Sequence, residues 1–118
     1  MVNEQLPQDV LINNTDKDLV DFEMDIYWTV TAGVDPLNYM RQHPGRFKLA
    51  HIKDRIKNVP VEAQWESCNL GAGVIDYENM LPLLKTEGIK HFMVEQEILG
   101  VNTASKCKKN AAIMKAIM

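Results

Sequence analysis

The chain has 118 residues, of which 46% are hydrophobic and 25% charged, as expected for one folded domain with a modest core. The formal net charge is −3 and the basic residues are scattered, which disfavours nucleic acid as a partner. No apolar run approaches the ~20 residues that span a bilayer, and the first ten residues lack an export signal. We therefore expect no membrane partner and a cytoplasmic location, while the sequence leaves open whether a full-length parent is exported.

The first half of the chain predicts a strand, a short helix and a second strand. Residues 18–28 (DLVDFEMDIYW) concentrate apolar side chains, as in a strand covered on both faces, and residues 7–15 before them are typical of the tail of a helix. Asp35 is a candidate N-cap for a short helix that begins with proline and is stopped by a Pro-Gly pair. Residues 46–52 (RFKLAHI) form the second predicted strand.

The second half predicts a loop, a helix, a strand and a final helix. Residues 54–75 contain a proline and two glycines and are typical of a long irregular loop. Asp76 is the expected cap of the next helix, and Pro82 inside that helix should bend it or shift its start. Residues 89–97 (IKHFMVEQE) form the third predicted strand, and residues 103–118 form an amphipathic helix.

Strands that alternate with helices indicate parallel strands joined by crossovers, and hence an α/β fold. Three parallel strands leave two open edges and little room for a core. We therefore expect either a piece of a larger barrel or open sheet, or a chain that completes itself by association. The second case predicts a homo-oligomer. Both cysteines, Cys68 and Cys107, are expected to be free thiols.

Each predicted strand finishes with an acid or an imidazole after an apolar run. These residues are Asp25, His51 and Glu95. In parallel α/β folds, functional groups collect at the carboxyl ends of the strands. Two carboxylates and one imidazole suit Mn²⁺, Co²⁺, Mg²⁺ or Zn²⁺. Taken singly, a buried histidine is more often a hydrogen-bonded core residue, and Asp25 alone fits a cap for a following turn.

The sequence resembles the sugar phosphate isomerase/epimerase family, the xylose-isomerase-like TIM barrels. Four motifs carry the resemblance, in the family's order: the Asp-aromatic-Trp strand end at residues 25–28, His-x-Lys-Asp at 51–54, Gly-x-Gly-x-x-Asp at 71–76 and Val-Glu-Gln at 94–96. In the family these elements form only strands six to eight of an eight-stranded barrel, which takes ~250 residues. The resemblance thus implies that residues 1–118 are a single partial domain, the C-terminal part of a (β/α)8 TIM barrel with about three parallel strands.

The resemblance also implies a metal-dependent isomerase or epimerase that acts on a sugar or sugar phosphate by proton transfer through an enediolate. Family members hold a divalent metal with Glu, Asp, His and a second Glu. Asp25, His51 and Glu95 match the last three, and Glu95 would also be the catalytic acid/base. The first glutamate belongs to a strand that would precede Met1, so the resemblance implies a fragment that is inactive alone. The alternative is a non-catalytic α/β module derived from that family, with a structural or self-associating role.

Three further residues are candidate substrate contacts. Lys53 and Asp54 follow the histidine and are expected at the pocket rim, where Lys53 either contacts an anionic or hydroxyl-rich substrate or is a solvated loop lysine. Trp28 occupies a position where some ketose epimerases of the family carry a histidine, and it is a candidate aromatic wall against a sugar ring. Glu97, two residues past the third strand-end acid, is the second choice for the later carboxylate ligand.

The remaining motifs are assigned more briefly. Trp65 and Glu66 lie in the long loop and are candidates for part of a lid. His43 and His91 are expected at the surface. The glycine-rich stretch at residues 70–76 lacks a preceding strand and the full dinucleotide pattern, so its glycines predict a tight loop near the pocket rather than a nucleotide site.

Overall fold

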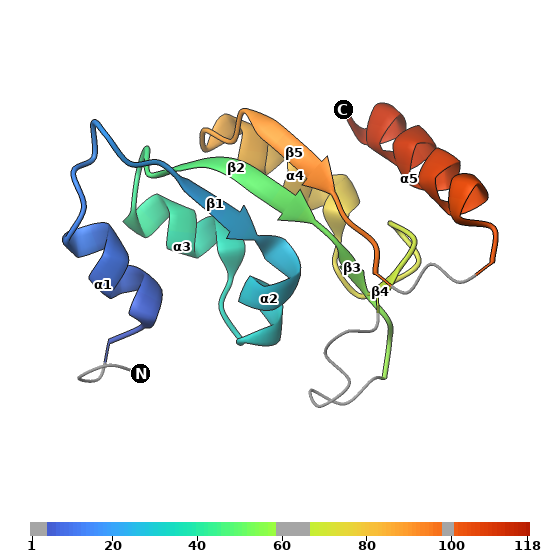
Figure 1. The fold of residues 1–118 in the computed structure, drawn as a ribbon, viewed down its shortest axis with the longest axis horizontal. Helices are drawn as coiled ribbons and strands as arrows, with labels where there is room; N and C mark the ends of the chain where they lie inside the picture. The colour runs from blue at the N-terminus through green and yellow to red at the C-terminus, as the bar shows by residue number, and fades with distance from the viewer. Residues whose placement is uncertain (1–4, 59–66, 98–100) are drawn as a thin grey trace.

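The computed structural model describes residues 5–58, 67–97 and 101–118, and its fold is shown in Figure 1. Three parallel strands form one sheet in the order β1-β2-β5, and two short antiparallel strands, β3 and β4, form another. Within the described ranges, no helix combines the length and apolar character that crossing a membrane requires. The elements are, in chain order, α1 (Pro7–Asn13), β1 (Phe22–Asp25), α2 (Ile26–Thr31), α3 (Pro36–Gln42), β2 (Phe47–Ile52), β3 (Asp54–Arg55), β4 (Ser67–Cys68), α4 (Tyr77–Thr86), β5 (His91–Val94) and α5 (Thr103–Ile117).

The register of the parallel sheet brings the three strand ends together. Asp25 on β1 lies opposite His51 on β2, and His51 lies opposite Met93 on β5. Just past β5, the backbone N–H of Glu95 donates to the carbonyl of Ile52 at 3.0 Å. All three arrows point the same way in Figure 1, so their carboxyl ends meet at one edge of the sheet. The predicted α/β class with three parallel strands and intervening helices is confirmed.

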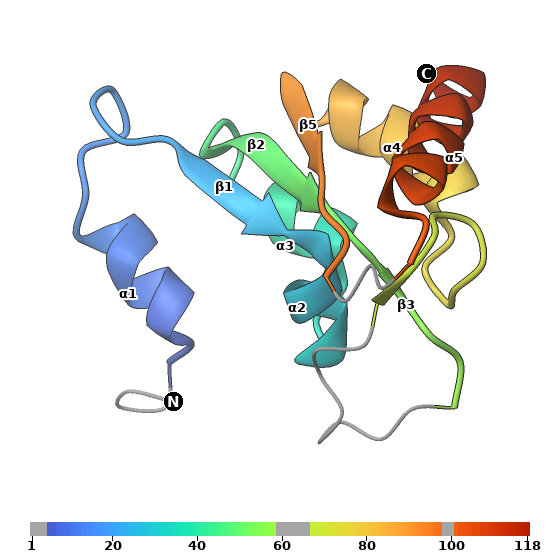
Figure 2. The same ribbon diagram turned by 45° about the vertical axis from the view of Figure 1, so that its right-hand side comes forward.

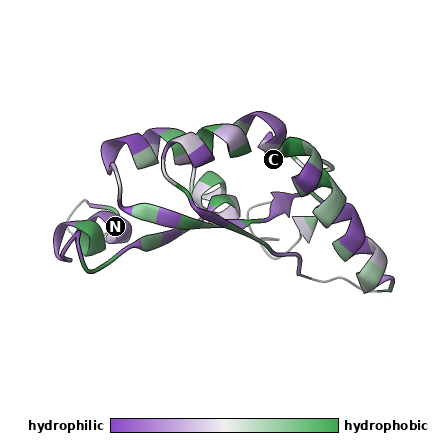
Figure 3. Ribbon diagram, turned by 90° about the horizontal axis from the view of Figure 1, so that it is seen from above, coloured by the Kyte–Doolittle hydropathy of each residue, from purple (hydrophilic) through white to green (hydrophobic). Residues whose placement is uncertain are grey.

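The two faces of the sheet differ in polarity because side chains alternate along a strand. Met24, Ala50 and Ile52 are 3%, 0% and 0% exposed and belong to the core that the helices cover. Glu23 and His51 alternate with them and project from the opposite face. In Figure 3, hydrophilic and hydrophobic residues correspondingly interchange along the ribbon. The polar face of the sheet is therefore where the candidate site lies.

The helices nearest the two ends of the chain, α1 and α5, lie beyond opposite edge strands of this sheet. Figures 1 and 2 both place α1 beyond β1 and place α4 and α5 together at the β5 side. Helices α3 and α4 begin at the predicted caps: Asp35 accepts from the Asn38 backbone N–H at 2.9 Å, and Asp76 from that of Asn79 at 3.3 Å. Helix α4 continues through Pro82 instead of starting after it. Within residues 54–75, which were predicted to be an irregular loop, the structure contains two short strands, β3 and β4.

The predicted strand over residues 18–28 is wrong in its extent. Strand β1 ends at Asp25, and the chain turns directly into α2, where the Asp25 side chain accepts from the Trp28 backbone N–H at 3.0 Å. Ile26 and Tyr27 are fully buried, but on a helix. A short apolar run looks the same in a buried strand and in a buried helix, so the spacing of its apolar residues could not locate the boundary between β1 and α2.

The two cysteines are free thiols, as predicted. Cys107 is exposed on α5, while Cys68 is half-buried on β4. Burial, followed by the nearby Asp54 carboxylate, raises the pKa of the Cys68 thiol to about 11. Because the thiolate is the nucleophile, Cys68 is poorly suited to a reactive role near neutral pH.

Candidate metal centre

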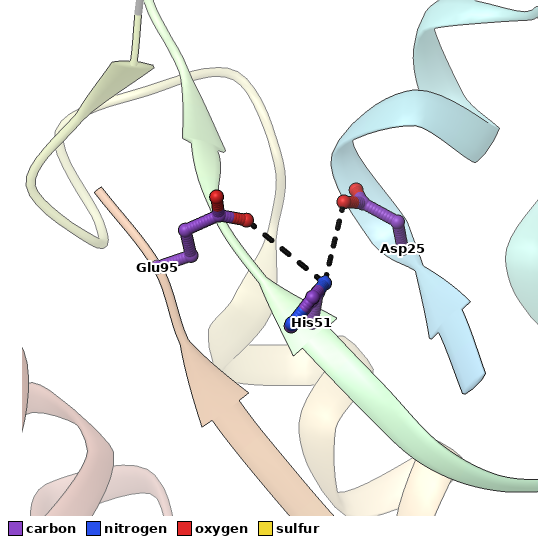
Figure 4. A group of neighbouring side chains, drawn as sticks. All are labelled: Asp25, His51 and Glu95. Atoms are coloured by element: carbon purple, nitrogen blue, oxygen red, sulfur yellow. Dashed lines mark ion pairs between the residues drawn. The ribbon is translucent and has the colours of Figure 1, made fainter. Parts of the chain in front are cut away.

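Asp25, His51 and Glu95 converge on one spot, as predicted. One ligand atom from each lies within 4.8 Å of the others. His51 Nδ1 is 3.7 Å from Asp25 Oδ2 and 3.9 Å from Glu95 Oε2, and both carboxylates point at the imidazole in Figure 4. Ligands that are each ~2.1 Å from a common ion lie ~3–4 Å apart. Small side-chain adjustments would therefore bring the three groups into bonding distance of one ion.

Local backbone structure aims these side chains. The Asp25–His51 register and the hydrogen bond from the Glu95 N–H to the Ile52 carbonyl place three neighbouring strand ends side by side. Asp25 is also the N-cap of α2: its Oδ1 accepts from the Trp28 N–H, which leaves Oδ2 facing His51. The cap thus fixes the carboxylate in the orientation that a ligand needs.

The donor set fits a divalent cation by charge as well as by geometry. Glu23, which was not predicted from the sequence, lies 3.0 Å from the other ring nitrogen of His51, Nε2. Three carboxylates, those of Glu23, Asp25 and Glu95, therefore surround one imidazole. Oxygen and imidazole ligands of this kind suit Mn²⁺, Co²⁺, Mg²⁺ and Zn²⁺. The signal for Glu23 was its spacing: it precedes Asp25 by two residues and so shares its strand face.

A cavity of about 420 Å³ lies beside β1 and is lined by one of the three candidate ligands, Asp25, but not by His51 or Glu95. Its lining includes Glu23, Asp25 and Trp28. The Trp28 side chain is 40% exposed, so an aromatic face is available to a ligand there. Cavities of this size accommodate small polar molecules, with apolar walls and a few polar groups. The position of Trp28 agrees with an aromatic wall, and its contact with a substrate stays a prediction.

Lys53 is buried, contrary to the alternative of a solvated loop lysine. Its side chain is 1% exposed, and its Nζ lies 3.3 Å from Glu97 Oε1. The ammonium lies 4.6 Å from the centre of the Tyr27 ring and 5.2 Å from that of Trp28. Burial raises the pKa of the Tyr27 hydroxyl, which stays neutral beneath the ammonium. Glu97 therefore pairs with Lys53 and does not belong to the three-residue ligand group.

Asp54 was expected at the pocket rim, but its side chain is 0% exposed. Oδ1 accepts from the backbone N–H groups of Arg55 at 2.8 Å and Ile75 at 3.2 Å, and Oδ2 from those of Gly71 and Gly73 at 3.0 Å each. A Cβ atom at Gly73 would overlap this carboxylate. The glycine-rich stretch is thus a tight loop wrapped around Asp54.

The other polar candidates lie away from the centre or outside the described residues. His91 is exposed, as predicted. His43 is half-buried rather than at the surface, with its Nε2 3.3 Å from Asp9 Oδ1. The candidate lid residues Trp65 and Glu66 lie outside the described residues.

Comparison with known proteins gives a consistent assignment. Two crystal structures of sugar phosphate isomerase/epimerases from Parabacteroides distasonis match with TM-scores of 0.72, at 32% and 33% sequence identity. Each match covers 92% of this chain and 35% of the matched chain, so this chain spans about a third of their length. No family model matches, and no curated protein matches. The predicted resemblance and the partial-barrel fold are confirmed, and the assignment to strands six to eight stays a prediction.

Proposed function

Given the fold that it shares with sugar phosphate isomerase/epimerases, we propose that this chain carries the metal-binding part of a sugar or sugar phosphate isomerase/epimerase active site. The convergence of Asp25, His51 and Glu95 is the observation that carries the proposal. Mn²⁺, Co²⁺, Mg²⁺ and Zn²⁺ are the candidate ions, because all accept carboxylate oxygen and imidazole nitrogen.

The three ligands and their neighbours have separate roles in this proposal. When bound, the ion would supply Lewis-acid polarisation of the oxygens of a hydroxycarbonyl substrate. Asp25, His51 and Glu95 would hold the ion. Glu95 directs one carboxylate oxygen toward His51, and its other oxygen is available as a general acid/base for a proton on carbon. Trp28 packs against the sugar ring. Lys53 would reach an anionic or hydroxyl group of the substrate only if its buried ammonium left Glu97.

We also propose that the 118 residues alone do not catalyse the reaction. Inverting a carbon centre by proton transfer needs an acid/base group on each face of that carbon. The ligand group found in the described part of the chain has two carboxylates. In our proposal only Glu95 acts as an acid/base. The matched isomerase/epimerase structures are also about three times as long as the aligned part. Catalysis would therefore require groups beyond this cluster.

A self-associating, non-catalytic α/β module is the second candidate function. It is favoured by the outer strands β1 and β5, each of which pairs with β2 on one side within the described sheet. Unpaired strand edges are templates for pairing with another chain. We propose a homo-oligomer in which such edges meet. Light scattering over a range of concentrations should report a species larger than one chain, and a monomer throughout would contradict it.

Metal titration tests the first proposal. Metal-free protein should bind one Mn²⁺ per chain, measured as loss of the electron paramagnetic resonance signal of free Mn²⁺. Asp25→Asn keeps a good N-cap for α2 but removes a charged ligand, and His51→Ala removes the imidazole. Both should bind at least about tenfold more weakly. His91→Ala, at the exposed start of β5, is the matched control. Wild-type affinity in both ligand variants would refute the metal centre.

A further inference from the structure

Glu23 contacts the side of the His51 ring that faces away from the other two acids. Its Oε1 is 3.0 Å from His51 Nε2, whereas Asp25 and Glu95 approach Nδ1 at 3.7 and 3.9 Å. Glu23 is absent from the three-residue ligand group. The two nitrogens of one imidazole are therefore approached by different carboxylates, which indicates different tasks.

The sheet itself places Glu23 there. Glu23 and Asp25 are two residues apart on β1, so both project from the polar face, while Met24 between them is 3% exposed in the core. Asp25 is directly opposite His51, and Glu23 is opposite Leu49, two residues earlier on β2. Glu23 thus approaches the imidazole as a diagonal neighbour, a distance that a long side chain can span.

We propose that Glu23 is a positioning residue that accepts a hydrogen bond from the Nε2–H of His51. A distance of 3.0 Å between Nε2 and Oε1 is that of an ordinary N–H···O bond. A neutral imidazole carries one proton, and a hydrogen bond at one nitrogen decides that the other has the free lone pair. With the proton on Nε2, the lone pair of Nδ1 faces Asp25 and Glu95. The inference rests on the proposed function, because it assigns a supporting role within the same site.

This role also explains why a third acid is tolerated so near the ligand group. A carboxylate that accepts from a ligating histidine fixes the orientation of the ring and raises the basicity of the ligating nitrogen. Because Glu23 lies on the Nε2 side, it cannot bind an ion at Nδ1 without leaving its present contact. Glu23 therefore acts through His51.

Two substitutions separate positioning from direct ligation. Glu23→Gln keeps an acceptor oxygen for the imidazole N–H, and Glu23→Ala removes it. Glu87→Ala is the control, because Glu87 forms a comparable ion pair, 2.8 Å from Arg41, away from the site. We expect Glu23→Ala to bind Co²⁺ about 10–100-fold more weakly than wild type, Glu23→Gln to recover most of that loss, and Glu87→Ala to match wild type. Wild-type affinity in Glu23→Ala would overturn the proposal, as would a loss in Glu23→Gln equal to that in Glu23→Ala.

A measurement without metal tests the contact independently of metal binding. In protein labelled with ¹⁵N-histidine, the side-chain N–H of His51 should be visible at Nε2 in wild type and Glu23→Gln, and lost to solvent exchange in Glu23→Ala. A His51→Gln variant assigns the signal. An N–H at Nδ1 in wild type, or an unchanged signal in Glu23→Ala, would overturn the proposal. If wild type binds no Co²⁺, the proposed function fails and this signal alone decides the role of Glu23.

Discussion

Replacing Asp54 by asparagine should destabilise the fold strongly although it changes only one atom of the side chain. The carboxylate is fully buried and accepts from four backbone N–H groups, two on each oxygen. An asparagine offers one acceptor oxygen and one NH₂ donor. In either orientation of the amide, two backbone N–H groups lose their acceptor and face a donor instead. Flipping the amide therefore does not restore the lost hydrogen bonds.

The expected magnitude follows from those two broken contacts. A hydrogen bond to a charged group contributes about 1.5–3 kcal/mol, and leaving a buried donor unsatisfied costs about 1–3 kcal/mol. The loop over residues 69–75 can shift to recover part of this loss. We therefore expect Asp54→Asn to lower the free energy of unfolding by about 2–4 kcal/mol. Urea unfolding followed by circular dichroism should show a lower midpoint at an unchanged m-value.

Asp76→Asn is the matched control for this substitution. Asp76 is exposed at the N-cap of α4, where asparagine is an equally good cap. We expect a change in the free energy of unfolding of about 0.5 kcal/mol or less. If Asp54→Asn costs no more than Asp76→Asn, the reasoning that Asp54 holds the glycine-rich loop is refuted.

Four further predictions concern residues near Asp54. Gly73→Ala should destabilise the protein by more than about 1 kcal/mol in urea unfolding, because its Cβ would overlap a buried carboxylate and a backbone carbonyl. Glu97→Ala should cost more stability than Lys53→Met in the same assay. The first change leaves the buried Lys53 ammonium without its carboxylate, whereas the second leaves Glu97, which is 41% exposed and can be solvated by water. The reverse order would contradict the pairing. The Cys68 thiol, with its pKa raised to about 11, should react with iodoacetamide at pH 8 more slowly than the exposed Cys107 in single-thiol variants. The unfolded chain ionises this thiol first as pH rises from about 9, so stability should fall between about pH 9 and 11. The fall should begin only above about pH 10 in Cys68→Ser, where the buried Tyr39 and Tyr77, whose pKa values are also raised, still contribute.

The parts of the site that the sequence predicted are those that depend on chain order and strand direction. Each apolar run ends in an acid or an imidazole, and parallel pairing of the strands is enough to bring these ends together. Asp25, His51 and Glu95 meet for that reason. The caps at Asp35 and Asp76 were equally predictable, because a cap is a contact within one turn of the helix.

The parts that were missed depend on contacts between distant segments. Lys53 and Asp54 come two and three residues after His51, just past the end of β2, and a strand end that leaves the sheet suggests a pocket rim. Burial of the lysine instead depends on α2, which supplies two aromatic rings, and on Glu97 from the segment after β5. Burial of Asp54 depends on N–H groups from a loop about 20 residues later, at Gly71 and Gly73. The sequence around residues 53 and 54 gives no sign of these contacting groups.

The candidate centre separates two requirements that a complete enzyme must meet together. Ion binding needs only the relative placement of three side chains, and the hydrogen-bonded register of β1, β2 and the segment after β5 fixes that placement within this chain. Substrate binding needs walls around the ion, yet the side chains of Asp25, His51 and Glu95 are 24%, 39% and 37% exposed. Metal affinity should therefore follow the integrity of the three-stranded sheet, whereas turnover should depend on whatever covers its polar face.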